Sequence, residues 1–258
     1  MIALSVVIIT LNEEQNIERC IRSVQSVADE IVVIDSHSAD NTAAIARQLG
    51  ARIVLQHFLG HIEQKNFATE QAKNDWVLSI DADEELSAEL AEEIKKIKSN
   101  PIARAYHFNR LNNYCGHWIR HGSWYPDRKI RLYNRVAGEW KGENPHDRWT
   151  LYDERDKPVM LKGDLLHYSY SSISDHLKKI EKYSDIAARQ KVNKGQDCSI
   201  VKIWLGPKWK FVKDYIIKLG FLDGYWGFLV CKLSSMENLA KYAKTRQYAR
   251  WKRQGKNF

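Results

Sequence analysis

Short apolar runs alternate with amphipathic segments through the first hundred positions of the 258-residue chain. The pattern predicts strands that end near Asn12, Ile34 and Gln56, and a fourth strand, "DWVLSI", that leads directly into Asp81. Helices are expected after these strands, for example from Thr42 to Leu49 before a glycine, and in "SAELAEEIKKIKSNP", which begins at a Ser cap. Such alternation is typical of βαβ units, so we expect an α/β fold with a mostly parallel sheet flanked by helices.

The pattern loosens from about residue 103, where aromatic, His and Arg residues gather. We expect strands near 104–110 and 129–134 with a long loop between them, and long structured loops are usually functional. The segment "GEWKGENPHDRW" is interpreted as a second polar loop. The segment "VMLKGDLLHYSY" is interpreted as a strand, or two short strands, ending near His167.

The residues after Ser172 have a helical pattern and an unusual charge. Residues 1–171 carry a net charge of −4, whereas residues 172–258 carry +12. A basic region of this kind suits nucleic acid or the anionic face of a membrane. An apolar stripe at helical spacing is expected to pack on the rest of the chain while lysines meet lipid phosphates. The stripe consists of Val212, Tyr215, Ile216 and Leu219.

These observations predict two parts. Residues 1–171 would form the body, with halves 1–100 and 101–171, and residues 172–258 a helical, basic, membrane-associating region. No stretch approaches the roughly 18 apolar residues of a spanning helix, so any membrane contact would be peripheral. The four cysteines lie far apart without a C-x-x-C pair, which favours a reducing cytosolic setting. The first apolar run lacks a basic leader and is interpreted as a strand, not a signal peptide.

Polar side chains follow three of the predicted strands at the point where each strand ends. They are Asn12, Asp35 and the pair Asp81 and Asp83. Ligands of parallel sheets bind beyond the carboxyl ends of the strands, so these side chains are expected at one edge. A D-x-D alone is weak, because roughly one arises by chance in a chain this acidic. Three polar strand ends together predict a binding site, whereas a single one would equally suit a solvated turn.

Motifs along essentially the whole chain together resemble inverting family 2 glycosyltransferases of the GT-A fold. The nucleotide-binding strand ends are matched by "SVVIITLNEEQNI" and "VVIDSHSADNT", and the basic segment before the central strand by "GHIEQKNFA". The D-x-D strand is matched by "LSIDADEEL", and the acceptor-side motifs by "WYPDRKIRLY", "ENPHDRW" and "LHYSY". The resemblance is closest to the bacterial branch of lipopolysaccharide inner-core β-1,4-glucosyltransferases.

The resemblance implies a nucleotide-sugar site with Mg²⁺ or Mn²⁺, which offsets the charge of the departing diphosphate. Asp83 would be the main metal ligand, and His167 matches a late histidine offered to the metal or the diphosphate. Lys65 stands where the family usually has Arg, which leaves a point charge without the bidentate fork. The nucleotide-sugar-binding residues implied are Thr10, Leu11, Asn12, Glu13, Asp35, Lys65, Asp81, Ala82 and Arg131.

The reaction implied by the resemblance needs a base that takes the proton from the acceptor hydroxyl. In the family this base is a carboxylate downstream of the D-x-D, which Asp147 matches, with Glu143 as the alternative. Arg128 and Arg131 are expected to hold an anionic acceptor or the leaving diphosphate. Simpler roles stay open at two positions: Asp35 as a cap of the next helix, and His167 as a core histidine.

The function predicted is metal-dependent transfer of one hexose, glucose from UDP-glucose, to the lipopolysaccharide inner core. The partners would be the nucleotide-sugar donor, a lipid-linked saccharide acceptor and the anionic cytoplasmic face of the bacterial inner membrane. One alternative is transfer to a polyprenyl phosphate, a capsule or another glycan. Another is a nucleotide-binding or nucleic-acid-binding protein without catalysis. No nucleic-acid motif is present, so nucleic acid is not an expected partner.

Overall fold

The computed structural model describes residues 1–143 and 146–256, which form two compact units. Unit 1 contains residues 1–110 and 127–167, and unit 2 contains residues 111–126 and 168–256. The sequence predicts a single division near residue 171. In the structure the segment 111–126 groups with the C-terminal helices, so the chain enters unit 2 twice.

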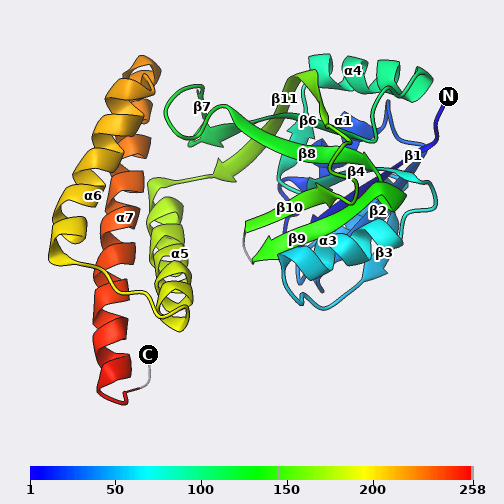
Figure 1. Ribbon diagram of the computed structural model, residues 1–258. Helices are drawn as coiled ribbons and strands as arrows, with labels where there is room; N and C mark the ends of the chain where they lie inside the picture. Colours follow the sequence, from blue (N-terminus) through cyan, green and yellow to red (C-terminus); the bar gives the residue numbers. More distant parts are fainter. Residues whose placement is uncertain (144–145, 257–258) are drawn as a thin grey trace. The chain divides into compact units, whose positions relative to one another are not determined.

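The first half of unit 1 has the predicted alternation of strands and helices (Figure 1). Four parallel strands lie in the order β3-β2-β1-β4, and each following strand is reached through a helix. This parallel half confirms the α/β fold expected from the pattern. The elements are β1 (Leu4–Thr10), α1 (Ile17–Val24), β2 (Glu30–Asp35), α2 (Thr42–Gln48), β3 (Arg52–Leu55), α3 (His61–Glu70) and β4 (Trp76–Asp81).

The sheet continues beyond β4 in the order β8-β6-β11-β5, and the β4–β8, β8–β6 and β11–β5 pairs are antiparallel. The D-x-D segment does not lead straight into a helix, because the short strand β5 comes first. Helix α4 then begins at the predicted cap, where the Ser87 hydroxyl accepts from the Leu90 N–H. The elements are β5 (Glu84–Leu86), α4 (Ala88–Ser99), β6 (Ala105–Tyr114), β7 (His117–Ile119), which pairs with β6, β8 (Asp127–Asn134) and β11 (Val159–Tyr170).

The expectation of a polar loop at "GEWKGENPHDRW" is wrong. After a short 3₁₀ turn, η1 (Arg135–Ala137), strands β9 (Gly138–Glu143) and β10 (His146–Leu151) form an antiparallel hairpin. Trp140 and Trp149 face each other in its register, and both are buried. Trp149 stacks on Tyr133 with ring centroids 3.6 Å apart. Burial of two large aromatic rings stabilises strands in a segment whose other residues are polar.

Unit 2 consists mainly of helices α5 (Ile173–Asn193), α6 (Ile200–Val212) and α7 (Gly224–Arg253). Ser172 and Ser199 cap α5 and α6 through their hydroxyls. Both helices pack against the long helix α7 (Figure 1). The connection from α6 to α7 is a π-helical turn, η2 (Lys213–Ile217), followed by a 3₁₀ turn, η3 (Gly220–Asp223).

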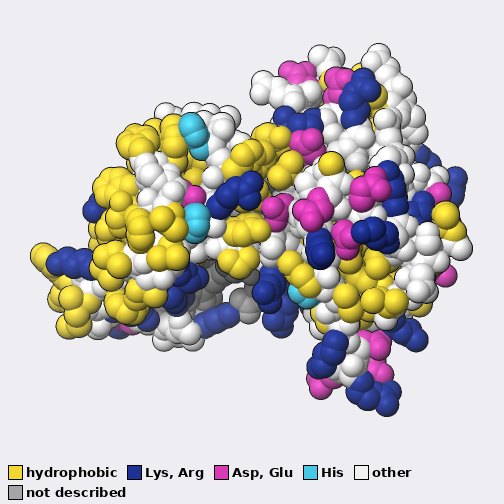
Figure 2. Space-filling view, turned by 90° about the horizontal axis from the view of Figure 1, so that it is seen from above, with side chains coloured by type: hydrophobic (Ala, Val, Ile, Leu, Met, Phe, Trp, Pro, Cys, Tyr) yellow, Lys and Arg dark blue, Asp and Glu magenta, His cyan; other side chains and the backbone are white. Residues whose placement is uncertain are grey.

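The predicted apolar stripe does not pack as expected. Val212, Ile216 and Leu219 are exposed, whereas Asp214 is buried. The Ser123 hydroxyl and the Lys210 ammonium both donate to the carboxylate of Asp214, the latter at 2.7 Å. The sequence argument assumed regular α-helical spacing, and the π-helical winding of η2 changes which residues share a face. Figure 2 shows hydrophobic side chains gathered on the surface formed by α6, α7 and their connection.

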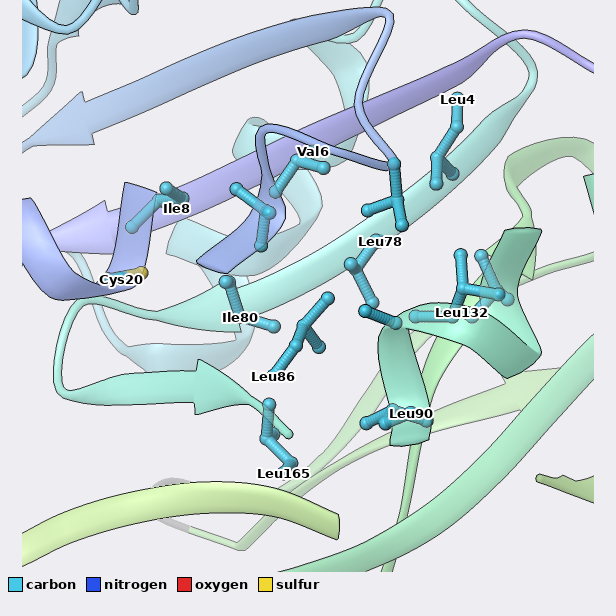
Figure 3. Close-up of a cluster of buried hydrophobic side chains, with 14 of the residues drawn as sticks. Leu4, Val6, Ile8, Cys20, Leu78, Ile80, Leu86, Leu90, Leu132 and Leu165 are labelled. Atoms are coloured by element: carbon cyan, nitrogen blue, oxygen red, sulfur yellow. The ribbon is translucent and has the colours of Figure 1, made fainter. Parts of the chain in front are cut away.

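The core of unit 1 holds the strands that position the candidate site. Val6 and Ile8 of β1 pack with Leu78 and Ile80 of β4 in one buried cluster (Figure 3). Leu165 of β11 joins the same cluster, so the parallel and antiparallel strands share one core. Among the described residues, no helix combines the length and apolar character needed to cross a membrane.

Candidate nucleotide-sugar site

Three parallel strands end side by side at one edge of the sheet. In the strand registers Thr10 pairs with Asp35, and Ile9 pairs with Asp81. Ala82 continues the pairing, because its N–H donates to the Ile9 carbonyl at 3.2 Å. The strand order β2-β1-β4 therefore brings together the polar strand ends that the sequence separates by up to 71 positions, as predicted for a parallel sheet.

The loops after β1 and β2 are tied to each other through Asp35. Its buried carboxylate accepts from the Ser38 N–H at 3.1 and 3.2 Å. The Ser38 hydroxyl in turn accepts from the Asn12 N–H at 2.8 Å, and the Asn12 side chain accepts from the Ala39 N–H at 2.8 Å. Asn12 has a left-handed φ of 55°, which Asn adopts more readily than most residues. Asp35 thus orders the strand-end loops, and Asp40, not Asp35, bonds to Thr42 at the start of α2.

The neighbours of Asn12 have different surroundings. Leu11 is half exposed at the edge of the site. The Glu13 N–H donates to the Thr42 hydroxyl at 2.8 Å, which fixes the turn against α2. Thr10 is buried, and its hydroxyl has no hydrogen-bond partner within residues 1–143 and 146–256. A buried hydroxyl in this state is a feature that a ligand could complete.

Asp81 is held by a buried ion-pair network. Arg131 of β8 donates through Nη2 to Asp81 and to Glu84, each at 3.0 Å. Glu84 is buried and also accepts from the Asp81 N–H at 2.9 Å. Burial alone would raise the pKa of Asp81, but the charges of Arg131, Lys65 and Arg110 outweigh burial and hold that pKa well below its usual range. Asp81 is therefore a fixed anion at the strand end.

Lys65 of α3 connects this network to Asp147 of β10. The buried ammonium lies 2.6 Å from Asp147 Oδ2 and 3.4 Å from Asp81 Oδ1. It also lies 4.9 Å from the centre of the Trp140 ring. Burial raises the pKa of Asp147, but Lys65 and Arg131 more than compensate, so the pKa is lowered overall. A single lysine thus contacts two carboxylates, which its compact charge permits without a planar fork.

The β9–β10 hairpin explains how Asp147 reaches Lys65. Asn66, the next residue of α3, donates to the Trp140 carbonyl at 3.0 Å and accepts from the Trp140 N–H at 2.9 Å. The hairpin is therefore docked on the helix that carries Lys65. The alternative base, Glu143, belongs to the same hairpin, but its side chain lies outside the described residues.

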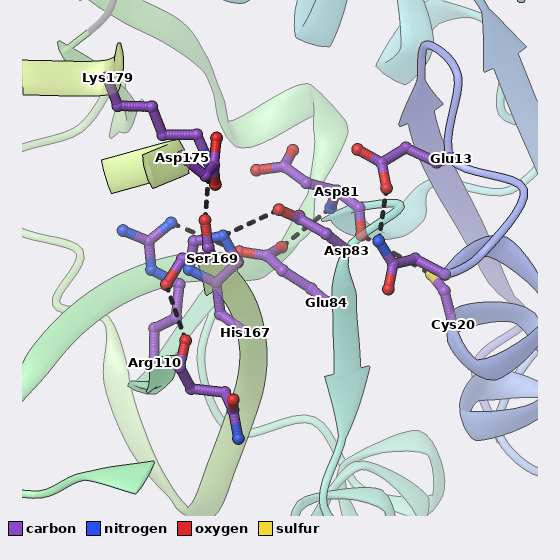
Figure 4. Close-up of polar contacts among 12 residues, drawn as sticks. Glu13, Cys20, Asp81, Asp83, Glu84, Arg110, His167, Ser169, Asp175 and Lys179 are labelled. Atoms are coloured by element: carbon purple, nitrogen blue, oxygen red, sulfur yellow. Dashed lines mark hydrogen bonds and ion pairs between the residues drawn. The ribbon is translucent and has the colours of Figure 1, made fainter. Parts of the chain in front are cut away.

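Asp83 and His167 lie together, as the resemblance implies. His167 Nε2 of β11 is 3.1 Å from Asp83 Oδ2, and both side chains remain partly exposed (Figure 4). A carboxylate oxygen and an imidazole nitrogen are suitable ligands for Mn²⁺, and a carboxylate suits Mg²⁺. Within residues 1–143 and 146–256 no cluster of three or more such ligands occurs. The pair therefore fits a divalent ion whose other ligands come from a substrate phosphate or water.

Sequence reasoning missed Glu84, Arg110 and Trp140. Glu84 and Glu85 are adjacent carboxylates, but the alternation of strand β5 buries the first and leaves the second partly exposed. Arg110 of β6 lies 3.5 Å from Glu84 and 2.9 Å from Asp127, so it completes the charge balance around Glu84. Arg128, in contrast, is exposed, and of the two predicted arginines the described residues place only Arg131 in this network.

Comparisons with known proteins point to one family. Residues 5–153 match the model of the family "Glycosyl transferase family 2". A Rickettsia typhi protein named as an uncharacterized glycosyltransferase is 34% identical over 253 residues, covering 95% of this chain and 87% of that protein. The lipopolysaccharide core biosynthesis glycosyltransferase LpsC of Rhizobium meliloti is 30% identical over 86% of this chain and 82% of its own length.

A solved structure shows a weaker likeness. The crystal structure of glucosyl-3-phosphoglycerate synthase from Mycobacterium tuberculosis, in complex with Mn²⁺, UDP and glucosyl-3-phosphoglycerate, is 25% identical over 43% of this chain and 44% of that one. Its TM-score of 0.36 carries no argument about function. The family model and the two relatives are sufficient: the chain belongs to glycosyl transferase family 2, and it is a glycosyltransferase with the GT-A fold predicted from its sequence.

Proposed function

We propose that the chain is a metal-dependent inverting hexosyltransferase that moves glucose from UDP-glucose to the lipopolysaccharide inner core. The observation that carries the proposal is the meeting of four side chains at one sheet edge. Asp81 and Lys65 form a charged floor, while the Asp83–His167 pair lies partly exposed beside it. This arrangement suits a nucleoside diphosphate and a divalent ion, because it combines a cation with an incomplete set of metal ligands.

The donor would be bound by the strand-end loops. Thr10, Leu11, Asn12, Glu13 and Asp35 are proposed to line the nucleoside. Asp83 and His167 would hold the divalent ion, which offsets diphosphate charge when the sugar leaves. The choice of UDP and glucose rests on the sequence resemblance.

Asp147 is proposed as the base that takes the proton from the acceptor hydroxyl. In the structure its carboxylate is ion-paired with Lys65, which lowers its pKa and its basicity. A diphosphate that draws the Lys65 ammonium toward itself would weaken this pair and raise the pKa of Asp147. The donor would then increase the basicity of Asp147 before the acceptor proton is removed.

The acceptor proposal rests on the similarity to LpsC, whose name assigns it to lipopolysaccharide core biosynthesis. A saccharide of this kind is lipid-linked, so we propose that the enzyme works peripherally at the cytoplasmic face of the inner membrane. The basic region after residue 172 supports that location through its net charge of +12. A polyprenyl-phosphate or capsule acceptor is tested by offering each lipid-linked acceptor separately and measuring sugar transfer.

The first test is calorimetric binding of UDP-, GDP- and ADP-sugars with and without Mn²⁺. We expect one nucleotide class to bind, and only with metal, because the protein supplies few of the metal ligands. Asp83→Ala should remove this metal-dependent binding. Glu85→Ala is the matched control, because Glu85 is only two residues away and pairs with Arg19 at 3.5 Å. Metal-dependent binding unchanged in Asp83→Ala would refute the assignment.

A further inference from the structure

The α6–α7 connection exposes an unusual amount of apolar surface. Large apolar side chains project from α6, from η2 and from η3, and each of the six most relevant is between 55% and 66% exposed. We call this surface of the helical α6–α7 hairpin the hairpin face; it is separate from the β9–β10 hairpin of unit 1. Figure 2 shows hydrophobic side chains gathered there. A contiguous apolar patch of this kind marks a contact site. The six are Trp204, Leu205, Trp209, Ile216, Ile217 and Leu222.

The exposed charge of the same segment is almost entirely lysine. Residues 199–236 contain six lysines, no arginine and two acidic residues, Asp214 and Asp223. Asp214 is buried and paired with Lys210. Asp223 accepts from the backbone N–H groups of Arg120 and His121 at 3.0 and 2.9 Å. Both carboxylates are thus engaged within unit 2, and the hairpin face presents apolar groups among positive charges.

This composition distinguishes a membrane from a protein partner. Lysine is depleted in protein–protein interfaces, whereas lysine with Trp and Tyr is enriched where helices lie at a membrane surface. Lys208 Nζ lies 5.8 Å from the centre of the Trp204 ring, and Lys232 Nζ lies 5.8 Å from that of Phe211. Their aliphatic stems therefore run along apolar surface while their ammonium groups stay accessible, as for lysines that extend toward headgroups.

We propose that the hairpin face inserts into the interfacial layer of an anionic phospholipid membrane. The apolar side chains lie among the upper acyl chains, and the lysines contact the lipid phosphates. This mode differs from adhesion through the basic charge of residues 172–258, because apolar burial supplies part of the affinity. The proposal rests on the membrane location in the proposed function and specifies how unit 2 would bind there. It concerns unit 2 alone, so it does not depend on which sugar or acceptor the enzyme uses.

A groove within this face gives the inserted lipid a place. It has a volume of about 520 Å³ and lies between α6 and α7. Trp204, Phe211 and Met236 contribute to its apolar lining. One polar lining residue, Ser235, is already satisfied, because its hydroxyl donates to the Pro207 carbonyl at 2.8 Å. We assign the groove to one acyl chain of a phospholipid, since its volume lies within the roughly 300–1,000 Å³ typical of ligand sites.

The test measures binding of the full chain to vesicles of phosphatidylglycerol and phosphatidylethanolamine by sedimentation. The variant Ile216→Ser/Ile217→Ser/Leu222→Ser should lower the partition coefficient at least about 10-fold, because three exposed apolar side chains no longer insert. The control Leu55→Ser/Leu59→Ser/Ile102→Ser changes three apolar residues of unit 1 that are 54% to 69% exposed, and should leave binding within about twofold of the original.

Salt separates insertion from simple charge attraction. In 0.5 M NaCl, on the order of three times physiological ionic strength, screening should weaken binding of the unmodified chain without abolishing it. The triple hairpin variant should lose the residual binding. Complete release of the unmodified chain by salt, or equal binding by both triple variants, would overturn the inference.

Two further measurements test which molecule contacts the groove and the hairpin face. Phospholipid with brominated acyl chains should quench tryptophan fluorescence, and Trp204→Phe should remove more of this quenching than Trp76→Phe in unit 1. Equal losses would overturn the assignment of the groove. Light scattering without vesicles tests a second copy of the chain as the occupant. A dimer that the triple hairpin variant converts to monomer, with unchanged vesicle binding, would overturn the membrane assignment.

Discussion

Units 1 and 2 depart from the usual distribution of side chains in opposite directions. In unit 1, Lys65, Glu84 and Arg131 are no more than 3% exposed although all three are ionisable. In unit 2, Trp204 and Trp209 are 66% and 59% exposed although both are large and apolar. Buried ion pairs contribute little net stability, and an exposed apolar patch contributes none. Neither arrangement is explained by net folding stability alone, and each coincides with a binding site proposed above.

The comparison also shows how each unit keeps its exceptional groups in place. Unit 1 uses reciprocal ion pairs, in which Arg131 joins Asp81 and Glu84 while Lys65 joins Asp81 and Asp147. Unit 2 uses close packing at the α6–α7 connection.

Replacing the proposed base should give the largest effect. Asp147→Asn should lower the transfer rate by about 10²–10⁴-fold, because the amide cannot accept the acceptor proton. Donor binding should persist, since Asp83 and His167 are unchanged. Asp153→Asn, in the turn after β10, is the control and should transfer normally. Near-normal transfer by Asp147→Asn would instead favour Glu143 as the base.

Removing the central cation of unit 1 should weaken folding. Arg131→Leu should lower the free energy of unfolding by about 3–5 kcal/mol, because Asp81 and Glu84 lose their shared partner in a buried site. Arg128→Leu removes an exposed arginine from the same strand and should change the free energy of unfolding by less than about 1 kcal/mol. Urea denaturation measures both, and equal losses would show that removing Arg131 does not leave Asp81 and Glu84 as uncompensated buried charges.

Close packing in unit 2 can be tested with two helical glycines. A Cβ at Gly227 would lie 2.0 Å from the Gly220 carbonyl oxygen, so Gly227→Ala should lower the free energy of unfolding by about 1–3 kcal/mol. A Cβ at Gly206 would meet the ring of Tyr242 at 2.8 Å, and a side chain can shift more readily than backbone. Thermal unfolding should therefore show a smaller loss for Gly206→Ala. The opposite order would argue against a rigid α6–α7 connection.

The stability of unit 2 should also depend on pH. Burial and the nearby charge of Lys179 lower the pKa of His176 from its usual 6.5 to about 4. The His176 imidazole therefore stays neutral down to a lower pH in the folded chain than in the unfolded chain. The unfolded chain takes up the proton first as pH falls, so stability should decline from pH 6.5 to about 4.

His176→Phe removes the titrating group and should flatten this decline, at some loss of the contact with the Tyr114 hydroxyl. His57→Phe alters an exposed histidine and should leave the pH dependence unchanged. Thermal melts across this pH range measure both variants. The same slope in His176→Phe as in the unmodified chain would contradict the role of His176.

Much of unit 1 follows from the sequence because its signals are local. A strand period, a capping serine or an apolar run depends on neighbouring residues, and the pattern located β1 to β4 and the cap of α4. The parallel topology then implies that strand ends meet at one edge of the sheet. This allowed the proximity of Asp35 and Asp81 to be predicted from the sequence. The motif resemblance added Asp83 and His167, and the structure places their side chains 3.1 Å apart.

The failures occur where burial depends on residues distant in the sequence. Alternation in β5 selects Glu84, not Glu85, for burial, and Arg131, 47 positions later, neutralises it. Stacking of Trp149 on Tyr133 stabilises the β9–β10 hairpin in a segment that its polar residues predict to be a loop. The π-helical turn places Asp214 inside and Ile216 outside, against helical spacing.

Local patterns along the chain therefore predict the order of elements, the sheet edge at which the polar strand ends meet, and the charge of the two parts. The tertiary structure alone decided which carboxylate is buried, that Lys65 pairs with Asp147, and that the apolar stripe of unit 2 faces outward. The physical reason is that period and charge are properties of a local segment. Burial and ion pairing are properties of neighbours in space, and folding chooses those neighbours from the whole chain.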